Sequence, residues 1–135
     1  MTALAEDRNT PRKDGDLLEL PMSGTVAIFA GALTCVSTLG NAVPGRTDTD
    51  LKAAGRAEES VDNTTGDAGD KTVKIRRGVF KFENDETDPV TAANILSDCY
   101  VVDDQTVAAT DGSSTRSKAG KVLGVEDDGV WVEIR

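Results

Sequence analysis

The side chains in this sequence that suit acid–base chemistry are carboxylates standing next to one another. They occur at Glu58 with Glu59, at Asp103 with Asp104, and at Glu126 with Asp127 and Asp128. A glycosidase needs two carboxyl groups across a cleft, whereas adjacent residues of a strand point to opposite faces of a sheet. The last group also falls in a predicted turn. We therefore interpret these acids as solvated surface groups.

The chain of 135 residues contains no histidine. Histidine is the commonest general base and a member of the Ser-His-Asp and Cys-His catalytic arrangements, so both arrangements are excluded. The glycine-containing loops match neither GxGxxG nor GxxxxGK[ST], the common phosphate-binding patterns. We expect a protein that is not an enzyme, with no catalytic residues and no cofactor.

Cys35 and Cys99 are the two cysteines of the chain. They are far apart in sequence and have no histidine beside them, which leaves too few ligands for a zinc site and no CxxC redox motif. The acidic loop 62–71 lacks the residue order of a calcium-binding loop. We predict two buried free thiols and no metal site. A disulfide between the cysteines stays open, although a reducing cytosol rarely keeps one.

The charge balance argues against nucleic acid and membrane partners. The chain has 24 acidic and 15 basic residues and a formal net charge of −9, whereas DNA, RNA and anionic lipids attract positively charged surfaces. The uncharged window 20–39 contains proline, glycine and hydroxyl residues, so it is too polar for a membrane helix. Residues 1–16 lack the apolar run of an export signal.

The segment 73–82, VKIRRGVFKF, alternates apolar with basic residues and then loses its register at a glycine. Continued alternation would expose two of the three phenylalanines, so we predict a one-residue bulge at Arg77 and Gly78. The bulge directs one set of side chains to the core, namely Val73, Ile75, Phe80 and Phe82. It directs the other set outward as a cationic stripe, defined as Lys74, Arg76 and Lys81, with Arg77 at the kink.

Two interpretations of the cationic stripe remain open. In the first, its cations pair with the protein's own Asp and Glu on neighbouring strands or protect an edge strand from aggregation. In the second, they dock onto an acidic protein surface, including that of a second copy, where charge complementarity sets the orientation.

The organisation of the chain indicates an extended arm followed by one β domain. Residues 1–16 are polar and have no periodicity, which predicts an extended N-terminal arm. From residue 17 to residue 135, short apolar runs alternate with glycine, proline and acidic turns, among them a tight hairpin at 127–129. We predict an all-β domain, a jelly-roll-like sandwich or small barrel of about eight to ten short strands, with one helical turn within 90–99. The large core fillers expected are Phe29, Phe80, Phe82, Tyr100 and Trp131.

Three segments, read together, resemble the small head decoration (cement) proteins of tailed bacteriophages. They are GALTCVSTLGNAVPG, GRAEESVDNTTGDAGDKTVKIRRGVFKFEN and YVVDDQTVAATDGSSTRSKAGKVLGVEDDGVWVEI, and they cover most of the chain from Gly31 to Ile134. The resemblance implies a structural virion protein that is made in the host cytoplasm and binds the outer surface of the capsid. It implies the major capsid protein and further copies of itself as partners, as a homodimer in preference to a homotrimer.

The resemblance also gives the cations a use. Arg8, Arg12 and Lys13 of the arm are candidate contacts to the capsid or to a neighbouring subunit, together with the cationic stripe and Arg77. An extended arm adds a strand to a neighbouring sheet in many complexes. Two alternatives stay open: a small β-rich tail, baseplate or spike component of a phage virion, and a glycan-binding module on the virion surface.

Overall fold

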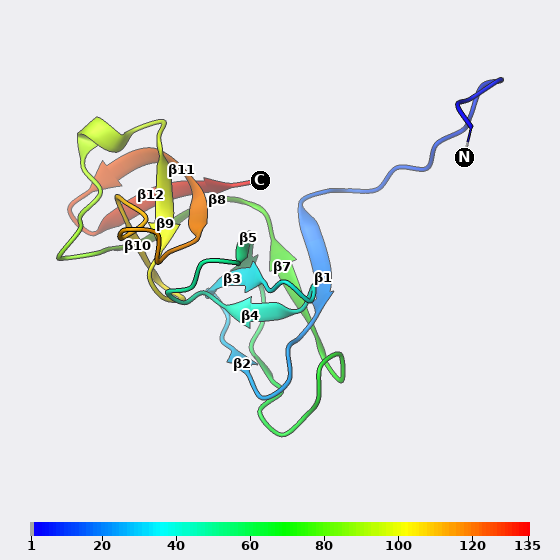
Figure 1. Ribbon diagram of the computed structural model, residues 1–135, viewed down its shortest axis with the longest axis horizontal. Helices are drawn as coiled ribbons and strands as arrows, with labels where there is room; N and C mark the ends of the chain where they lie inside the picture. Colours follow the sequence, from blue (N-terminus) through cyan, green and yellow to red (C-terminus); the bar gives the residue numbers. More distant parts are fainter. Residues whose placement is uncertain (1) are drawn as a thin grey trace.

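The computed structural model describes residues 2–135 and shows an all-β protein (Figure 1). The strands are β1 (Leu17–Pro21), β2 (Ala27–Ile28), β3 (Leu33–Val36), β4 (Ala42–Pro44), β5 (Lys52–Ala57), β6 (Val61–Asp62), β7 (Thr72–Arg76), β8 (Gly78–Asn84), β9 (Asp98–Val101), β10 (Thr106–Ala108), β11 (Lys118–Glu126) and β12 (Gly129–Ile134). One 3-10 helix, η1 (Ala92–Asn94), precedes β9. The predicted all-β class, small barrel and single helical turn are confirmed, although residues 2–135 contain twelve strands.

The first half of the chain forms a five-stranded sheet in the order β1-β7-β5-β3-β4, with the two-stranded pair β2-β6 beside it. The pairings of the five-stranded sheet are antiparallel. Strand β5 carries an extra residue opposite β3, since Thr34 pairs with Gly55 and Cys35 with Ala53. Gly55 has a φ of 152°, and a Cβ there would collide with the carbonyl oxygen of Arg76 on β7. Glycine is therefore required at this irregularity.

The second half of the chain forms a closed barrel in the order β10-β8-β12-β11-β9. Strands β11 and β12 pair from Glu126 and Gly129 onward, so the tight turn predicted at 127–129 is confirmed. Strand β12 alternates as predicted, because Val130, Val132 and Ile134 are buried and the two residues between them are half-buried. Alternation with one face on the core is the expected pattern for a barrel strand.

The two sheets share a hydrophobic core. The larger cluster holds the inward residues of the barrel and also Leu33, Cys35 and Val43 of the five-stranded sheet. A second cluster, around Met22, Val73 and neighbouring alanines, fills the other side of that sheet. Cys35 and Cys99 are buried and free, as predicted.

The expectation for the aromatic residues was partly wrong. Phe82 is buried, and Phe80, Tyr100 and Trp131 are half-buried. Phe29, in contrast, exposes 67% of its surface. It directly follows the two-residue strand β2.

The predicted bulge at Arg77 and Gly78 was wrong in its cause, although the inward and outward residues agree with the expectation. Val73 and Ile75 are buried and Phe82 is buried, while Lys74 and Lys81 are exposed. Residues 73–82 are not one bulged strand, however, because β7 belongs to the five-stranded sheet and β8 to the barrel. The chain changes sheets at Arg77, and Gly78 adopts a φ of 153° at that point.

In residues 2–135, no helix is long or apolar enough to cross a membrane.

Candidate interaction surfaces

The N-terminal arm projects from the body of the protein (Figure 1). Residues 2–16 are exposed and belong to no strand; residue 1 of the predicted arm lies outside the described residues. The Arg8 side chain donates a hydrogen bond to Thr10 Oγ1 at 3.0 Å. Within the described residues, Arg8, Arg12 and Lys13 form no ion pair, so their charges remain free to meet acids of a partner.

The arm leads directly into β1, which is an outer strand of its sheet. β1 pairs with β7 along one side, and within residues 2–135 no strand pairs with Leu17–Pro21 along its other side, although Met22, the next residue, forms a bridge with Ala42 of β4. An outer strand offers unpaired backbone N–H and C=O groups to another chain. The arm and the β1 edge therefore form one continuous surface capable of receiving or donating a strand.

The cationic stripe does not form a single surface on one strand. Lys74 and Arg76 lie on β7 of the five-stranded sheet, and Lys81 lies on β8 of the barrel. Lys74 stands opposite Glu19 of β1 in the register, but it has no ion pair within residues 2–135. Arg77, half-buried between the two strands, donates its backbone N–H to the Asp16 carbonyl at 2.7 Å.

Arg76 pairs with an acid of the same sheet. Its Nε lies 3.1 Å from Glu58 Oε1, and Arg56 of β5 donates to the same oxygen at 2.9 Å. The hydrogen bond from Arg56, with the charges of both arginines, lowers the pKa of Glu58. The Arg56 guanidinium also lies over the ring of Phe80 on β8, 4.7 Å from its centroid. This cluster ties the five-stranded sheet to the barrel.

Lys81 is held by the β11–β12 hairpin. Its Nζ lies 2.9 Å from Asp128 Oδ2 and 3.7 Å from Glu126 Oε2, and 5.7 Å from the centroid of the Trp131 ring. The hydrogen bond to Asp128 raises the pKa of Lys81 and lowers that of Asp128. For Arg76 and Lys81, the first interpretation of the stripe, pairing with the protein's own acids, therefore agrees with the structure.

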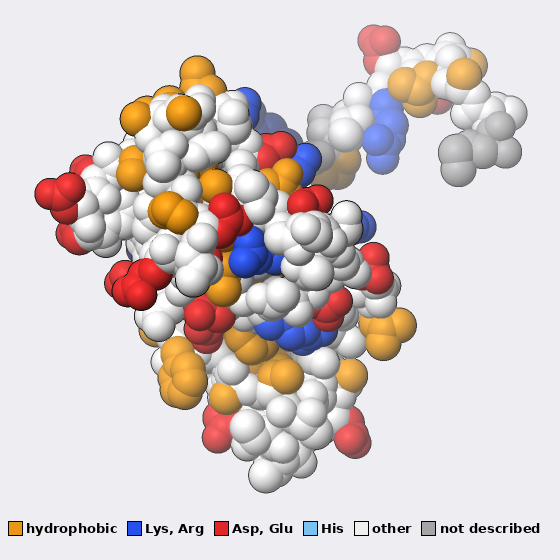
Figure 2. Space-filling view, turned by 60° about the vertical axis from the view of Figure 1, so that its left-hand side comes forward, with side chains coloured by type: hydrophobic (Ala, Val, Ile, Leu, Met, Phe, Trp, Pro, Cys, Tyr) orange, Lys and Arg blue, Asp and Glu red, His pale blue; other side chains and the backbone are white. Residues whose placement is uncertain are grey.

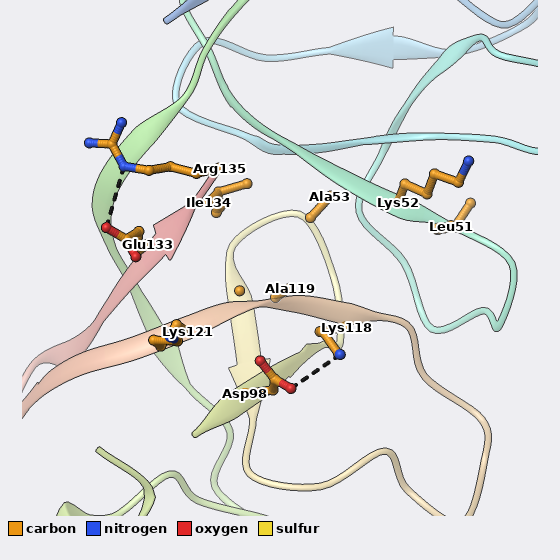
Figure 3. A pocket seen from close by; sticks show the side chains of 11 residues that line it. Leu51, Lys52, Ala53, Asp98, Lys118, Ala119, Lys121, Glu133, Ile134 and Arg135 are labelled. Atoms are coloured by element: carbon orange, nitrogen blue, oxygen red, sulfur yellow. Dashed lines mark hydrogen bonds and ion pairs between the residues drawn. The ribbon is translucent and has the colours of Figure 1, made fainter. Parts of the chain in front are cut away.

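A second cationic surface was missed by the sequence reasoning. It is a cleft of about 480 Å³ between β5 and the barrel strands β9, β11 and β12 (Figure 3). We call it the cationic cleft and define it by the four basic residues that line it, Lys52, Lys118, Lys121 and Arg135. Asp98 and Glu133 are the acids that line it, and Arg135 also pairs with Asp16 at 3.7 Å. The sequence SKAGK carries two of these lysines three residues apart, a spacing that regular alternation places on opposite faces.

An irregularity in β11 brings those two lysines to one face. Lys118 pairs with Tyr100 of β9 and Gly120 pairs with Cys99, so Ala119 is an extra residue on β11. Because a bulge shifts the alternation by one residue, Lys118 and Lys121 both face the side on which Asp98 lies. Gly120 allows β11 to lie this close to β12, since a Cβ at position 120 would collide with the carbonyl oxygen of Glu133.

Exposed aliphatic side chains gather near the helical turn. Ile95, Leu96 and Leu123 expose 43%, 68% and 40% of their surfaces, and Leu96 donates its backbone N–H to the Val122 carbonyl at 2.7 Å. The face drawn in Figure 2 shows hydrophobic side chains at the upper end of the molecule, the end at which the helical turn lies in Figure 1. Within residues 90–99, Val90 and Cys99 are buried, whereas Ile95 and Leu96 beside the helical turn are exposed.

The paired carboxylates occupy turns and ion pairs. Glu58 binds two arginines, and Glu126 and Asp128 surround Lys81. Burial and the neighbouring charge of Asp103 raise the pKa of Asp104. In residues 2–135, no group of three or more cysteine and acidic side chains is placed to hold a metal ion.

Comparison with known protein families, curated proteins and solved structures finds no match for this chain.

Proposed function

We propose that this chain is a structural, non-enzymatic subunit of a bacteriophage virion. It binds the outer surface of the head, bridges subunits of the major capsid protein and thereby stabilises the shell. The resemblance of three of its segments to head decoration proteins suggests this role. The structural observation that carries the proposal is the exposed arm, residues 2–16, running without interruption into the outer strand β1.

The arm and the β1 edge suit docking on a protein lattice for two reasons. An extended segment gains backbone hydrogen bonds by adding to a neighbouring sheet edge. In addition, Arg8, Arg12 and Lys13 form no ion pair within the described residues. Acids on a capsid subunit can therefore pair with these cations without displacing any of the protein's own acids. Weak contacts of this kind become effective when an oligomer makes several of them at once.

The net charge of −9 agrees with a position outside the shell. An acidic body repels the packaged genome and other anionic polymers. The cations of the arm then serve for orientation, because a local positive segment on a negative body aligns the molecule as it approaches an acidic site.

The test is co-sedimentation with empty capsid shells assembled from the major capsid protein of the same phage. Saturable binding at a fixed ratio of chain to capsid subunit supports the proposal. A chain lacking residues 2–16, checked for an unchanged circular dichroism spectrum, is expected to lose most of this binding. A Lys71→Gln variant serves as the control, since it removes one exposed charge that belongs neither to the arm nor to the cationic stripe.

Three results contradict the proposal or its docking mode. Absence of binding to shells favours the alternative that the chain is a tail, baseplate or spike component. That alternative is tested by co-purification of the chain with tail proteins. Binding that is unchanged by removal of the arm overturns the docking mode and leaves another face as the contact. Glycan binding in the absence of any shell would instead identify a carbohydrate-binding module.

A further inference from the structure

Strand β1 lies at the outside of the five-stranded sheet, next to the arm (Figure 1), and only part of its backbone bonds to β7. Directly before β1, the Arg77 N–H donates to the Asp16 carbonyl at 2.7 Å. Directly after β1, the Met22 N–H donates to the Lys71 carbonyl at 2.9 Å. Because bonding residues alternate along an antiparallel pair, the even-numbered residues of β1 bond to β7. The odd-numbered residues direct their backbone N–H and C=O groups to the free edge.

Both ends of this free edge are closed. At the beginning of β1 the chain bends at residues 15–16, where the arm leaves the line of the strand. At the other end, Pro21 has no N–H to donate, and the next residue bridges to Ala42 of β4. The free donors of the edge are therefore the N–H groups of Leu17 and Glu19, each accompanied by the carbonyl of the same residue.

The side chains of β1 make this edge largely apolar. Leu17 exposes 40% of its surface, and Leu18 is half-buried without packing in either core cluster. Glu19 is the single charged residue of the strand, and Lys74 lies opposite it on β7. Soluble proteins protect an apolar edge strand with several charges, a bulge or a covering segment. We therefore expect another chain to cover this edge.

We propose that the β1 strands of two copies of this chain pair antiparallel across a twofold axis. In this pairing, Leu17 of each copy exchanges two backbone hydrogen bonds with Glu19 of the other copy. All free donors of both edges are then used, together with the carbonyls of the same residues. The axis passes between the two Leu18 residues, so the apolar side chain that the core leaves half-covered meets its own counterpart.

The closed ends of the edge select both this register and a second copy as the occupant. A register that pairs Leu17 with Leu17 sets the remaining donors against the bend at residues 15–16. A register that pairs Glu19 with Glu19 sets them against Pro21, and it places two carboxylates directly opposite each other, which destabilises a sheet. The edge is thus complementary to itself in one register, as an interface on a twofold axis requires.

The pairing does not rest on the proposed function, although it gives that function a geometry. Because the strands are antiparallel, the two arms leave the joined sheet at opposite ends. One dimer can therefore contact two capsid subunits, and two linked contacts bind more tightly than one. The two proposals fail separately, since dimerisation is measured in the absence of shells and the capsid role is measured by co-sedimentation.

Removal of one free donor tests the pairing in the full chain. Glu19→Pro deletes an N–H that faces the free edge and leaves the hydrogen bonds to β7 in place, and proline is tolerated at such positions of edge strands. Sedimentation equilibrium from about 1 µM to about 1 mM covers the range of weak interfaces, and we expect a monomer–dimer equilibrium for the unaltered chain. Glu19→Pro is expected to weaken dimerisation at least about tenfold, because two of the four hydrogen bonds are lost. Glu19→Gln is the matched control: it removes the charge, keeps the N–H and is expected to dimerise.

Cross-linking through an introduced cysteine tests the register. In the proposed pairing, the two residues 18 form a non-hydrogen-bonded pair with Cα atoms about 4.5 Å apart, within the range that a disulfide spans. Leu18→Cys is therefore expected to form a covalent dimer with oxidised glutathione as the oxidant. Leu20→Cys is the control on the same face, since the two residues 20 are about 14 Å apart in this register, and it is expected to form little dimer. Cys35 and Cys99 are buried and do not compete.

Several results overturn the proposal. A chain that stays monomeric up to about 1 mM, or that assembles as a trimer, has no twofold pairing of β1. Equal dimerisation of Glu19→Pro and Glu19→Gln shows that the edge donors are not used. Equal cross-linking of Leu18→Cys and Leu20→Cys excludes the register. Circular dichroism shows whether each variant is folded, and the cross-linking comparison decides the question if Glu19→Pro does not fold.

Discussion

Asp88 joins two loops of the barrel, and its substitution by asparagine gives a sharp test of the structure. Its Oδ2 accepts hydrogen bonds from the Thr110 N–H at 3.1 Å, from the Thr110 hydroxyl at 2.5 Å and from Arg116 NH1 at 2.9 Å. The Ala109 N–H donates to the Asp88 carbonyl at 3.0 Å. The segment that precedes the helical turn is thereby attached to the loop between β10 and β11.

The expected cost of Asp88→Asn follows from the exposure of this ion pair. The Arg116 and Asp88 side chains expose only 16% and 27% of their surfaces, and Arg116 Nε is buried with no hydrogen-bond partner. Hydrogen bonds to charged groups contribute about 1.5–3 kcal/mol. Because solvent partly screens the pair, we expect a loss of about 1.5 kcal/mol in the free energy of unfolding, or roughly 4–8 °C in Tm for a chain of this size.

The assay is thermal and denaturant unfolding followed by circular dichroism. Asp111→Asn is the matched control, because it makes the same charge change in the β10–β11 loop to which Asp88 is attached, and the Asp111 side chain forms no hydrogen bond within the described residues. Equal Tm values for the two variants would refute the reasoning.

The pH dependence provides a second check. The hydrogen bonds from Thr110 and the charge of Arg116 hold the pKa of Asp88 below its usual value. A lowered pKa in the folded state means that the stabilisation is fully present above the unfolded value of about 3.9 and is lost as the pH falls below it. The difference between the unaltered chain and Asp88→Asn is therefore expected at pH 7 and should shrink below about pH 4. A difference independent of pH contradicts the role of the charge.

Three other predictions concern the thiols and two backbone positions. Burial raises the pKa of Cys35 and of Cys99 to about 12. Because the thiolate is the reactive form, neither thiol should react with Ellman's reagent at pH 8 until the chain is unfolded in guanidinium. Rapid reaction of the folded chain contradicts this burial. Gly55→Ala should lower the free energy of unfolding by about 1–3 kcal/mol and Tm by several degrees, because its Cβ would collide with the Arg76 carbonyl oxygen at a φ that disfavours side chains. An unchanged Tm refutes the requirement for glycine. Leu96 has a φ of 68° and exposes 68% of its surface. Leu96→Gly should leave Tm equal or higher, because a non-glycine residue in this conformation costs about 1 kcal/mol in stability. A marked fall in Tm would show that the leucine side chain contributes to packing.

The local features of this protein were predictable from its sequence. Alternation placed Val130, Val132 and Ile134 on the buried face of β12, and the acidic pair followed by Gly129 indicated the hairpin turn. Burial of the two cysteines followed from the absence of other zinc ligands. The strand face and the turn depend on neighbouring residues, for which the period of a strand or the chemistry of a turn is sufficient information.

Sheet membership was decided by the tertiary structure. The sequence VKIRRGVFKF indicated correctly which side chains are inward, yet the same pattern fits one bulged strand or two strands of different sheets. Only the partner strands distinguish these possibilities: β7 lies between β1 and β5, whereas β8 lies between β10 and β12. Strand partners are chosen by contacts between residues far apart in the chain, which a local pattern does not encode.

The same limit applies to the candidate surfaces. The exposed arm and its three cations were apparent from polarity and the absence of periodicity. The cationic cleft was not apparent, because it depends on the extra residue Ala119 in β11 and on the ion pairs of Asp98 with Lys118 and of Glu133 with Arg135. The sequence thus determined the composition, the alternation and the turns, whereas the fold determined which charges are neutralised, since pairing requires side chains from separate strands to meet in space.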